Sequence, residues 1–595
     1  MAQNKLKLSK NALKVLQARY LRKDRDRRIV ETPEELFVSV ARAVADAELS
    51  FSGPSAAELW GERFHEVLMS LSFLPNSPTL MNAGKPLGQL SACFVLPVED
   101  SMEGIFDALK DMALVQRTGG GTGFSFSRLR PKGDMVASTS GEASGPVSFM
   151  KIFDCATENI KQGGKRRGAN MGVLRVDHPD ILEFIEAKLD GKSLRNFNIS
   201  VGITDKFMEA AGKDLPYDLI HPSTGKVRGS LKAKEVFERI VRAAWETGDP
   251  GLLFLDSINR ANPTPHLGQI EATNPCGEVP LLPYESCNLG SINLARMLGN
   301  NGGTVTIDWE KLRSTVEVAT RFLDNVIEVS RYPVPEISRV TRGNRKIGLG
   351  VMGFAEMLIR MSIPYDSPEA VKLGQEIMHV IAGQARRTSI QLARDRGVFP
   401  NWRGSIHEAR HEKVRNATRT AIAPTGTIAI IADTSASIEP FFALAYKRTH
   451  VLGDQSLYEI NPVLLELLDR YELDVESVLE ETLEKGSVKT SAAIPEDIKR
   501  LFVTALDITP DRHLEIQAAF QKHVDNSVSK TVNLPADAAV QDVASIYWRA
   551  WELGLKGVTI YRYGSKALQV LELGVDEEAL HYDHASRCDP EECRL

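Results

Sequence analysis

The sequence has few cysteines and no long apolar run, and both absences narrow its class. Six cysteines in 595 residues are too few for a fold built on disulfides. The first residues, Met1 to Lys5, lack the apolar core of a secretory signal, and no stretch is long enough to cross a bilayer. We therefore expect a cytoplasmic protein with reduced thiols and no membrane partner, in which a disulfide would serve chemistry.

A strong excess of charge is also missing. The formal net charge is −6, with 43% hydrophobic and 25% charged residues, as is typical of soluble globular proteins. This balance argues against a general nucleic-acid binder, so an anionic ligand must meet a local basic patch. No internal repeat stands out. Length alone is typical of roughly four domains, although large barrels form one unit.

Local signals predict helices near the N-terminus and in mid-chain. Ser9 is a predicted helix cap, and Thr32-Pro33-Glu34-Glu35 has the Thr, Pro and Glu of a strong helix start. Asp308 is predicted to cap a long amphipathic helix that ends before Pro333. We expect the first 70 residues to form a helical region with a structural role.

Three segments have the composition of phosphate-binding loops. Gly119 to Gly123 is glycine-rich but lacks the Lys-Ser/Thr ending of a P-loop, so its signal is weak. Gly163 to Gly168 is flexible and basic, typical of either a solvated loop or a nucleotide clamp. Ala421 to Ile428 is either an ordinary β-turn or a turn whose N–H groups and threonine hydroxyls hold an anion.

The cysteines carry the most specific signal. Cys276 lies within Asn274-Pro-Cys-Gly-Glu278, Cys287 follows eleven residues later, and Cys93 is far upstream. Local sequence offers Cys276 no histidine partner of the kind that activates a nucleophile. The sixth cysteine, Cys155, is interpreted as a small core residue.

The remaining two cysteines, Cys588 and Cys593, lie in an acidic tail without an apolar pattern. With His581 and His584 nearby, a zinc site is one interpretation of this tail. A redox interpretation fits better, because it also accounts for Cys93 and Cys287: a mobile thiol pair would carry electrons to a buried site. We predict no metal site.

Longer motifs make the chain resemble the catalytic subunit of ribonucleotide reductases, most closely the adenosylcobalamin-dependent class. The resemblance runs from about Asn11 to the C-terminus. Its motifs are Leu74 to Gly84, Ser91-Ala92-Cys93, Asn274 to Glu278, Cys287-Asn288-Leu289, Pro424-Thr425-Gly426-Thr427 and Gly557 to Arg562.

The resemblance implies a thiyl-radical mechanism with named residues. Cys276 would become the thiyl radical, Glu278 would take the proton of the 3′ hydroxyl, and Asn274 would hold the geometry. Cys93 and Cys287 would supply two electrons and end as a disulfide. Cys588 and Cys593 would reduce that disulfide and be re-reduced by a thioredoxin-like protein.

Binding sites for substrate and effector are implied in the same way. The ribonucleotide would contact Ser77, Thr79, Ser91, Ala92, Pro424, Thr425, Gly426, Thr427 and Ile428. Deoxynucleotide or ATP effectors would contact Asp100, Ser101, Arg128, Lys165, Arg166 and Arg167. In the family the effector site lies at a dimer interface, so a homodimer is expected.

The radical source is inferred from what the motifs contain. The iron-dependent class uses two adjacent tyrosines, whereas here Arg562 separates Tyr561 from Tyr563. No glycyl-radical motif occurs near the C-terminus. Adenosylcobalamin is therefore the expected cofactor. The alternatives are a large subunit that needs a separate metal-radical protein, and a non-catalytic nucleotide-binding thiol protein.

The implied fold is a ten-stranded α/β barrel of two antiparallel five-stranded halves. A finger loop carrying Cys276 would enter its centre, beside a helical N-terminal region. The expected organisation is residues 1–70 helical, 71–572 catalytic barrel and 573–595 mobile redox tail. Pattern alone predicts only a large mixed α/β protein.

Overall fold

The structure is a computed structural model that describes residues 6–565 and 571–573, apart from 137–139, 163–165, 453–454, 472, 474–477, 479–480 and 483–484. Lys165, Cys588 and Cys593 lie outside the described residues. The side chains of Arg166 and Arg167 are likewise outside the description. The predicted redox tail therefore stays a prediction.

A helical region precedes the barrel, as predicted. Ser9 caps its first helix by accepting from the Ala12 N–H, and Thr32 and Glu35 form a reciprocal capping box. These caps fix where the first two helices start, and their apolar faces pack on the second half of the barrel. The elements are α1 (Lys10–Arg19), α2 (Pro33–Ala45), η1 (Asp46–Ser50), α3 (Pro54–Met69), β1 (Phe73–Pro75) and α4 (Ser77–Asn82).

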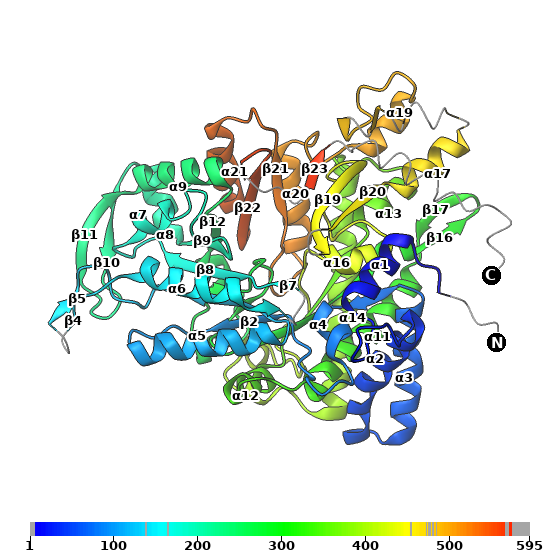
Figure 1. The fold of residues 1–595 in the computed structure, drawn as a ribbon, viewed down its shortest axis with the longest axis horizontal. Coiled ribbons are helices and arrows are strands. Elements are labelled where there is room, and N and C mark those ends of the chain that lie inside the picture. Colours follow the sequence, from blue (N-terminus) through cyan, green and yellow to red (C-terminus); the bar gives the residue numbers. More distant parts are fainter. Residues whose placement is uncertain are drawn as a thin grey trace.

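The first half of the barrel alternates strands and helices, and it lies at the left of Figure 1, coloured from light blue to green. Its strands pair in parallel in chain order, as expected for consecutive βα units. They are β2 (Cys93–Leu96), β3 (Gly121–Ser125), β8 (Asn170–Arg175), β9 (Phe197–Ile203) and β12 (Gly251–Phe254). The helices between them are α5 (Met102–Arg117), α6 (Pro146–Asn159), α7 (Ile181–Glu186), α8 (Asp205–Gly212) and α9 (Ala233–Thr247).

The second half repeats this arrangement. Parallel pairing joins β15 to β18 and β21 to β22, and parallel bridges from Leu349 to Thr420 and from Ile422 to Val528 connect the two pairs. The strands are β15 (Ser286–Asn293), β18 (Ile347–Met352), β21 (Thr531–Leu534) and β22 (Gly557–Arg562). Their helices are α11 (Trp309–Val329), α12 (Pro335–Asn344), α13 (Phe354–Arg360), α14 (Pro368–Arg396), α16 (Gly426–Ile431), α20 (Pro510–Gln521) and α21 (Val540–Glu552). Asp308 caps α11 as predicted.

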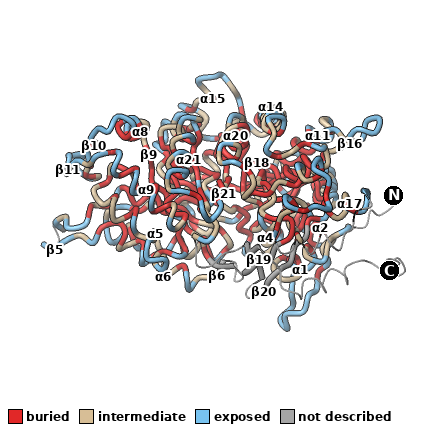
Figure 2. The backbone as a smooth tube through the Cα atoms, turned by 90° about the horizontal axis from the view of Figure 1, so that it is seen from above, coloured by how far each residue is buried: buried red, intermediate tan, exposed pale blue. Residues whose placement is uncertain are grey.

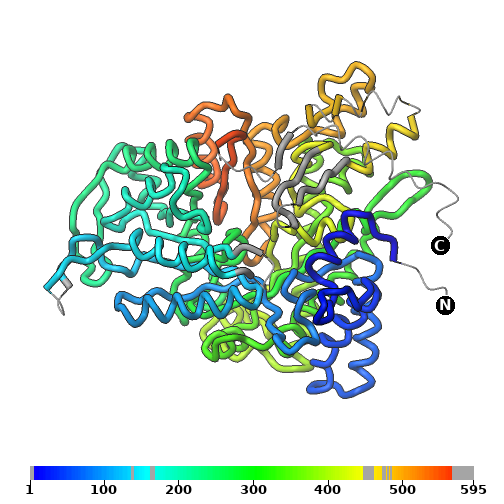
Figure 3. The backbone as a smooth tube through the Cα atoms, in the orientation of Figure 1, coloured from blue at the N-terminus to red at the C-terminus, as the bar shows by residue number. Residues whose placement is uncertain are grey.

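Two antiparallel seams join the halves. At one seam β2 pairs with β15, and at the other β12 pairs with β22, where the C-terminal strands return beside the first half (Figure 3). Counting the bridged segment 420–422, ten strands among the described residues close the barrel. The predicted architecture of two antiparallel five-stranded halves is confirmed.

A finger loop fills the barrel interior. It rises through β13 (Ala272–Thr273), turns at Cys276 and returns through β14 (Pro280–Leu281). Its apolar residues Ala272, Val279 and Leu281 pack with inward-facing strand residues such as Val173 and Leu289 in a core separate from the two outer ones. The predicted finger loop is therefore present, and it carries Asn274, Cys276 and Glu278 to the barrel centre.

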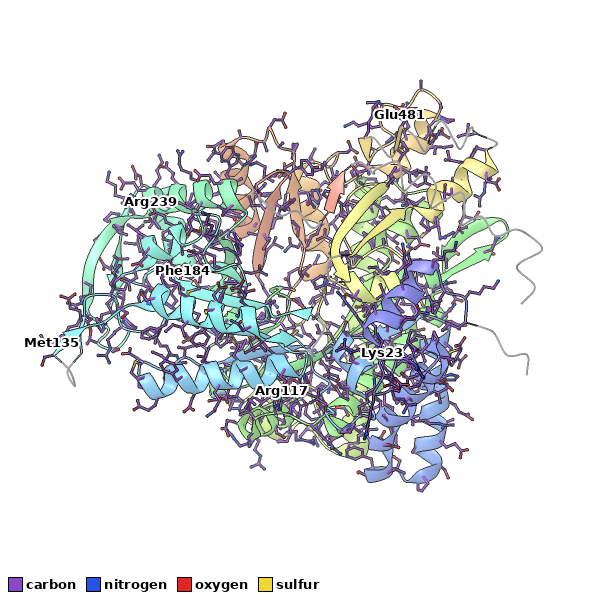
Figure 4. The ribbon with its side chains drawn as sticks, in the orientation of Figure 1. Lys23, Arg117, Met135, Phe184, Arg239 and Glu481 are labelled. Carbon is purple, nitrogen blue, oxygen red and sulfur yellow. The ribbon has the colours of Figure 1, made fainter. Side chains whose placement is uncertain are left out.

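Burial follows these layers, with buried backbone in both halves and exposed loops at the periphery (Figure 2). Helix α6 corrects one prediction: Cys155 is exposed, because α6 buries the face of Val147, Met150 and Phe153 instead. In Figure 4 Phe184 lies inside the first half, whereas Met135 lies at its outer tip and is 75% exposed.

Smaller elements surround the barrel. Among the described residues, no helix combines the length and apolarity needed to cross a membrane. The small sheets are β4 (Met135–Val136) with β5 (Gly141–Glu142), β6 (Lys161–Gln162) with β7 (Arg166–Arg167), β10 (Pro216–Ile220) with β11 (Val227–Lys232), β16 (Leu298–Asn301) with β17 (Thr304–Ile307), and β19 (Ala445–Leu452) with β20 (Gln455–Ile460) and β23 (Leu571–Leu573). The short helices are α10 (Leu255–Arg260), η2 (Pro265–Leu267), η3 (Leu294–Arg296), η4 (Pro400–Trp402), α15 (Ile406–Ala409), α17 (Pro462–Arg470), α19 (Glu496–Lys499) and η5 (Arg500–Phe502).

Candidate active site

Two cysteines far apart in the sequence face each other at the seam between the halves. Cys93 opens β2, Cys287 lies near the start of β15, and the two are direct partners in the antiparallel register. Both are buried thiols, 3% and 1% exposed. Directly opposed residues of antiparallel strands bring their Cβ atoms to about 5 Å, within reach of a disulfide after small adjustment.

The finger loop places an amide and a carboxylate against this thiol pair. The Asn274 Nδ2 donates to the Cys93 Sγ at 3.2 Å, and the Asn274 Oδ1 accepts from the Val279 N–H at 3.0 Å. Oε1 of Glu278 lies 4.0 Å from the Cys93 Sγ. The other carboxylate oxygen of Glu278 is buried without a hydrogen-bond partner. A buried acceptor left in this way is suited to a ligand hydroxyl.

Glycines on β3 make room for the finger. A Cβ at Gly123 would lie 1.7 Å from the Thr273 carbonyl oxygen, and one at Gly121 would lie 2.9 Å from the Pro275 Cγ. The weak phosphate-loop interpretation of Gly119 to Gly123 is thereby replaced by close strand–loop packing. From β9, Asn198 donates to the Pro275 carbonyl at 2.8 Å and gives the finger a second point of attachment.

Cys276 lies at the turn of the finger and is exposed, whereas Asn274, Pro275 and Glu278 are buried. Gly277 follows with φ +84°, a conformation that glycine adopts without strain, and a Cβ there would meet nothing within 4 Å. The sulfur of Cys276 is therefore accessible from the barrel opening. Its charge, when ionised, raises the pKa of the Cys93 thiol.

Burial controls the ionisation of these groups. Burial raises the pKa of the Cys93 thiol well above its ordinary value, and Glu278, Cys287 and Cys276 raise it further. Burial also raises the pKa of the Cys287 thiol. Burial raises the pKa of Glu278 to about 7, although a hydrogen bond from Asn274 works against the rise. At neutral pH the site therefore holds two protonated thiols and a carboxyl group ready to exchange a proton.

Two of the predicted substrate segments meet through α1. The Tyr20 hydroxyl lies 2.7 Å from the Ser77 Oγ, and the Arg19 Nη1 donates to the Thr427 Oγ1 at 3.5 Å. Thr79 is buried, and its hydroxyl lies 2.9 Å from both the Asn76 Oδ1 and the Leu90 carbonyl. Sequence reasoning missed Arg19 and Tyr20, whose only signal is their position at the end of the first helix.

The other predicted substrate residues lie beside the thiols or at the start of α16. The Ala92 N–H donates to the Cys287 carbonyl at 3.2 Å, and Ser91 lies 3.4 Å from Ser286 between the hydroxyl oxygens. Thr425 has φ +53° and accepts from the Ser437 N–H at 2.7 Å, so the turn after Pro424 is held rigidly. Gly426, Thr427 and Ile428 form the first turn of α16.

The described effector-site candidates lie together near the outer end of β3. Asp100 accepts from the backbone and side chain of Arg130, and Ser101 caps α5. Arg128 forms ion pairs with Glu99 at 3.1 Å and with Glu271 at 3.2 Å. Glu271 directly precedes β13, so this cluster touches the base of the finger.

Comparison with known proteins places the chain in a family. Two domain families match the chain, "Ribonucleotide reductase, barrel domain" over residues 91–413 and 407–561, and "Ribonucleotide reductase, all-alpha domain" over residues 6–88. The chain therefore belongs to the ribonucleotide reductase family.

Relatives define its position in that family more closely. The chain is 50% identical to the vitamin B12-dependent ribonucleoside-diphosphate reductase of Thermoplasma acidophilum, with 96% of this chain and 81% of that protein covered. It is 50% identical to a protein of the same name from Mycobacterium tuberculosis strain H37Rv, with 97% and 81% covered. The fold also matches the class Id ribonucleotide reductase alpha subunit of Actinobacillus ureae, with a TM-score of 0.76, 24% identity, and 94% and 97% covered.

Proposed function

We propose that this protein reduces ribonucleoside diphosphates to 2′-deoxyribonucleoside diphosphates by a thiyl-radical mechanism that adenosylcobalamin initiates. The observation that carries the proposal is the pairing of Cys93 with Cys287 directly below a finger loop that presents Cys276. The 50% identical relatives named vitamin B12-dependent reductases support the same cofactor and substrate class.

Each site residue has a distinct role in the proposed reaction. The Cys276 thiyl removes the hydrogen atom from C3′ of the ribose. Glu278 accepts the proton of the 3′ hydroxyl on the oxygen that is buried without a partner. Asn274 restricts both Cys93 and the finger backbone, so that the reacting groups keep their geometry.

The thiol pair completes the electron balance. The 2′ hydroxyl leaves as water after taking a proton from one thiol, and Cys93 and Cys287 together give two electrons. Their sulfurs then form one S–S bond, and Cys276 returns its hydrogen atom to C3′. One ribonucleotide and two thiols thus become one deoxyribonucleotide, one water and one disulfide. Raised thiol pKa values suit this role, because the thiols must arrive protonated.

The finger fits a radical-generating cofactor that approaches from the barrel opening. Cys276 is exposed there, Gly277 leaves space beside it, and Asn198 donates to the neighbouring Pro275 carbonyl. These residues would border the bound adenosylcobalamin. When bound, the cofactor would supply the radical that removes the hydrogen atom from the Cys276 thiol.

Substrate phosphates would lie between α4 and α16. Supporting this, Ser77 and Thr427 are both contacted by the end of α1, which brings hydroxyls from two segments to one place. The first N–H groups of a helix have no partner within it and point toward an anion, which suits the turn before Gly426. Ser91, Ala92 and Thr79 would border the ribose side.

Effectors would bind at the Asp100, Ser101 and Arg128 cluster, at a homodimer interface. Support for the interface comes from Met102 and Phe106 on α5 and Ile152 on α6, which are 57%, 45% and 39% exposed. Arg128 reaches Glu271 at the finger base, which offers a route from effector to active site. The cytoplasmic location and the thioredoxin-like reductant, acting through Cys588 and Cys593, also belong to this proposal.

A reconstitution tests the function. Purified protein receives adenosylcobalamin, a ribonucleoside diphosphate and dithiothreitol, and deoxynucleotide formation is measured by chromatography. We expect turnover without any second protein. Turnover only with a metal-radical subunit would favour the subunit alternative, and none under either condition would favour a nucleotide-binding thiol protein.

The Cys276→Ser variant tests the radical role directly. Because a hydroxyl does not replace the thiyl, we expect deoxynucleotide formation to fall below detection while nucleotide binding, measured by equilibrium dialysis, stays unchanged. Cys155→Ser is a matched control, since Cys155 is exposed and lies on α6 away from the finger. Repeated turnover by Cys276→Ser would reject the mechanism.

A further inference from the structure

A buried ion pair lies beside the thiol pair, near the starts of β15 and β18. The Lys346 Nζ donates to the Glu285 Oε2 at 2.7 Å, and both side chains are 1% exposed. Glu285 also accepts from the Leu282 N–H at 2.6 Å and from the Asn344 side-chain amide. Because these bonds occupy both carboxylate oxygens, the pair is held in one arrangement. Lysine and glutamate are rarely buried unless paired, so this placement calls for a reason.

The strand register places this pair next to Cys287. In the parallel pairing of β15 with β18, Asn288 is opposite Ile347. The residues that precede these two, Cys287 and Lys346, are therefore neighbours on the adjacent strands. Glu285 and Cys287 are two residues apart and share a face. A Cβ built at Gly348 would lie 3.6 Å from the Cys287 Sγ, so this sulfur lies close to β18. The Cys93 sulfur accepts a hydrogen bond from Asn274 of the finger.

We propose that Lys346, held by Glu285, makes Cys287 the leaving thiolate when the Cys93–Cys287 disulfide is reduced. This inference rests on the proposed function for the origin of the disulfide. Lys346 is a positioning residue, because it acts through the Cys287 sulfur and not on the nucleotide.

The exchange balances as follows. A reductant thiolate attacks the Cys93 sulfur, which lies on the finger side, and an S–S bond forms between the reductant and Cys93. The Cys93–Cys287 bond breaks, and its electron pair stays on Cys287 as a thiolate. The second thiol of the reductant then attacks the mixed disulfide and releases Cys93, and the reductant leaves as its own disulfide. A leaving thiol with a lower pKa departs faster. A cation beside Cys287 therefore makes Cys287, and not Cys93, the better leaving group.

The electrostatics support this direction. After burial, which raises the pKa of Cys287, Lys346 exerts the next largest effect and lowers it, ahead of Glu278 and Glu285, which raise it. For Cys93 the neighbouring charges of Glu278, Cys287 and Cys276 all raise the pKa. The two thiols therefore differ, and Cys287 is the one with a cation beside it.

Direct measurement of disulfide exchange tests the proposal. The full chain is oxidised with diamide and mixed with dithiothreitol. Samples are quenched with iodoacetamide, and alkylation at Cys93 and Cys287 is followed by mass spectrometry. We expect Lys346→Met to slow reduction several-fold, because the Cys287 thiolate loses its neighbouring cation and a leaving thiol of higher pKa departs more slowly. Lys346→Arg should restore most of the rate, because it keeps the charge.

Two further variants guard against a purely structural effect. Glu285→Gln removes a carboxylate that opposes the thiolate but leaves the lysine, so reduction should be at least as fast as in the parent. If Lys346→Met does not fold because Glu285 is left unpaired, the double variant Lys346→Met/Glu285→Gln removes both charges and should still be slow. Parental rates in the double variant would overturn the proposal.

The same variants separate this inference from the proposed function. Pre-reduced Lys346→Met should form deoxynucleotide in its first turnover as the parent does, because the thiols start in the reduced state. A parent that forms none would contradict the proposed function, while the exchange rates would still decide the role of Lys346.

Discussion

The two halves of the barrel share a topology, and both have large apolar cores, but they differ in their buried charges. The outer core of the first half is rich in phenylalanine: Phe124 packs edge-on against Phe153 at 5.1 Å between ring centroids, and Phe126 does so at 5.7 Å. Apolar burial of this kind is non-directional and does not change with pH.

The second half instead contains a buried charge network. Asp324 on α11 pairs with Arg345 at 2.8 Å and with Arg396 at 2.9 Å, and Arg396 continues to Glu48 at 2.5 Å. Asp324, Arg396 and Glu48 are fully buried. Since Glu48 lies in η1, the network fastens the N-terminal helical region to α11 and α14. Directional contacts of this kind suit a joint between two units.

The largest expected effect comes from breaking this network. Asp324→Asn leaves buried arginines without their shared carboxylate, and we expect the free energy of unfolding at pH 7 to fall by about 3–5 kcal/mol. Denaturant unfolding measures the loss. Glu183→Gln, which removes the exposed partner of Lys132, is the control and should cost less than about 1 kcal/mol. Similar losses for both would show that the network is not a structural joint.

Acid should remove the difference in stability between the parent and Asp324→Asn. Burial alone would raise the pKa of Asp324, but Arg345, Arg415 and Arg396 lower it to about 2 from the ordinary 3.8. A lowered pKa gives stability that is complete above the ordinary value and lost as pH falls toward the folded value. The gap between parent and Asp324→Asn should therefore narrow as pH falls toward 2.

A substitution in the finger should have a smaller effect of opposite sign, an increase in the free energy of unfolding. Burial raises the pKa of Glu278 from 4.5 to about 7, so ionisation destabilises the folded protein progressively between those values. Glu278→Gln should therefore increase stability at pH 8 by about 3 kcal/mol, at 1.36 kcal/mol per pKa unit, and much less at pH 5. The same variant should form no deoxynucleotide, because Glu278 is the proposed base.

Unfolding midpoints at both pH values test this, with Cys276→Ser as a control that keeps the carboxylate. A gain that is equal at pH 5 and pH 8 would contradict the assigned pKa. In the parent, the rate of deoxynucleotide formation should rise with pH through about 7, because only the ionised carboxylate accepts a proton.

The smallest effect is expected in the first half. Phe153→Leu keeps an apolar side chain but loses ring contacts, and we expect a loss of about 1 kcal/mol. The comparison predicts that this loss is the same at pH 4 and pH 8, since nothing that titrates is removed. Urea unfolding at both pH values measures it, and a marked pH dependence would show that the two halves are not as different as their cores indicate.

Local sequence was sufficient for the helix caps and for part of the site. Ser9, Thr32 and Asp308 all cap helices as predicted, because a cap depends on hydrogen bonds within one turn. The cysteine motifs, read through the family resemblance, identified residues that the fold brings together. The domain boundaries and the roles of individual residues stay predictions.

Other features depend on contacts between distant segments, which spacing does not reveal. Gly121 and Gly123 resembled a flexible loop but are strand residues that let the finger pass. Cys155 was placed in the core because it lies beside an apolar stripe of its helix, but packing buries the face of Val147, Met150 and Phe153 instead. The Lys346–Glu285 pair gave no signal, since charged residues are ordinarily exposed.

By itself the sequence determined where several helices begin, that the protein is a large mixed α/β protein, and that a cysteine lies between an amide and a carboxylate. Only the tertiary structure decided that Cys93 and Cys287 are cross-strand partners, that the finger lies against glycines, and which lysine stands beside which thiol. The physical reason is range: caps and turns are satisfied within a few residues, whereas barrel closure sets contacts between strands hundreds of residues apart.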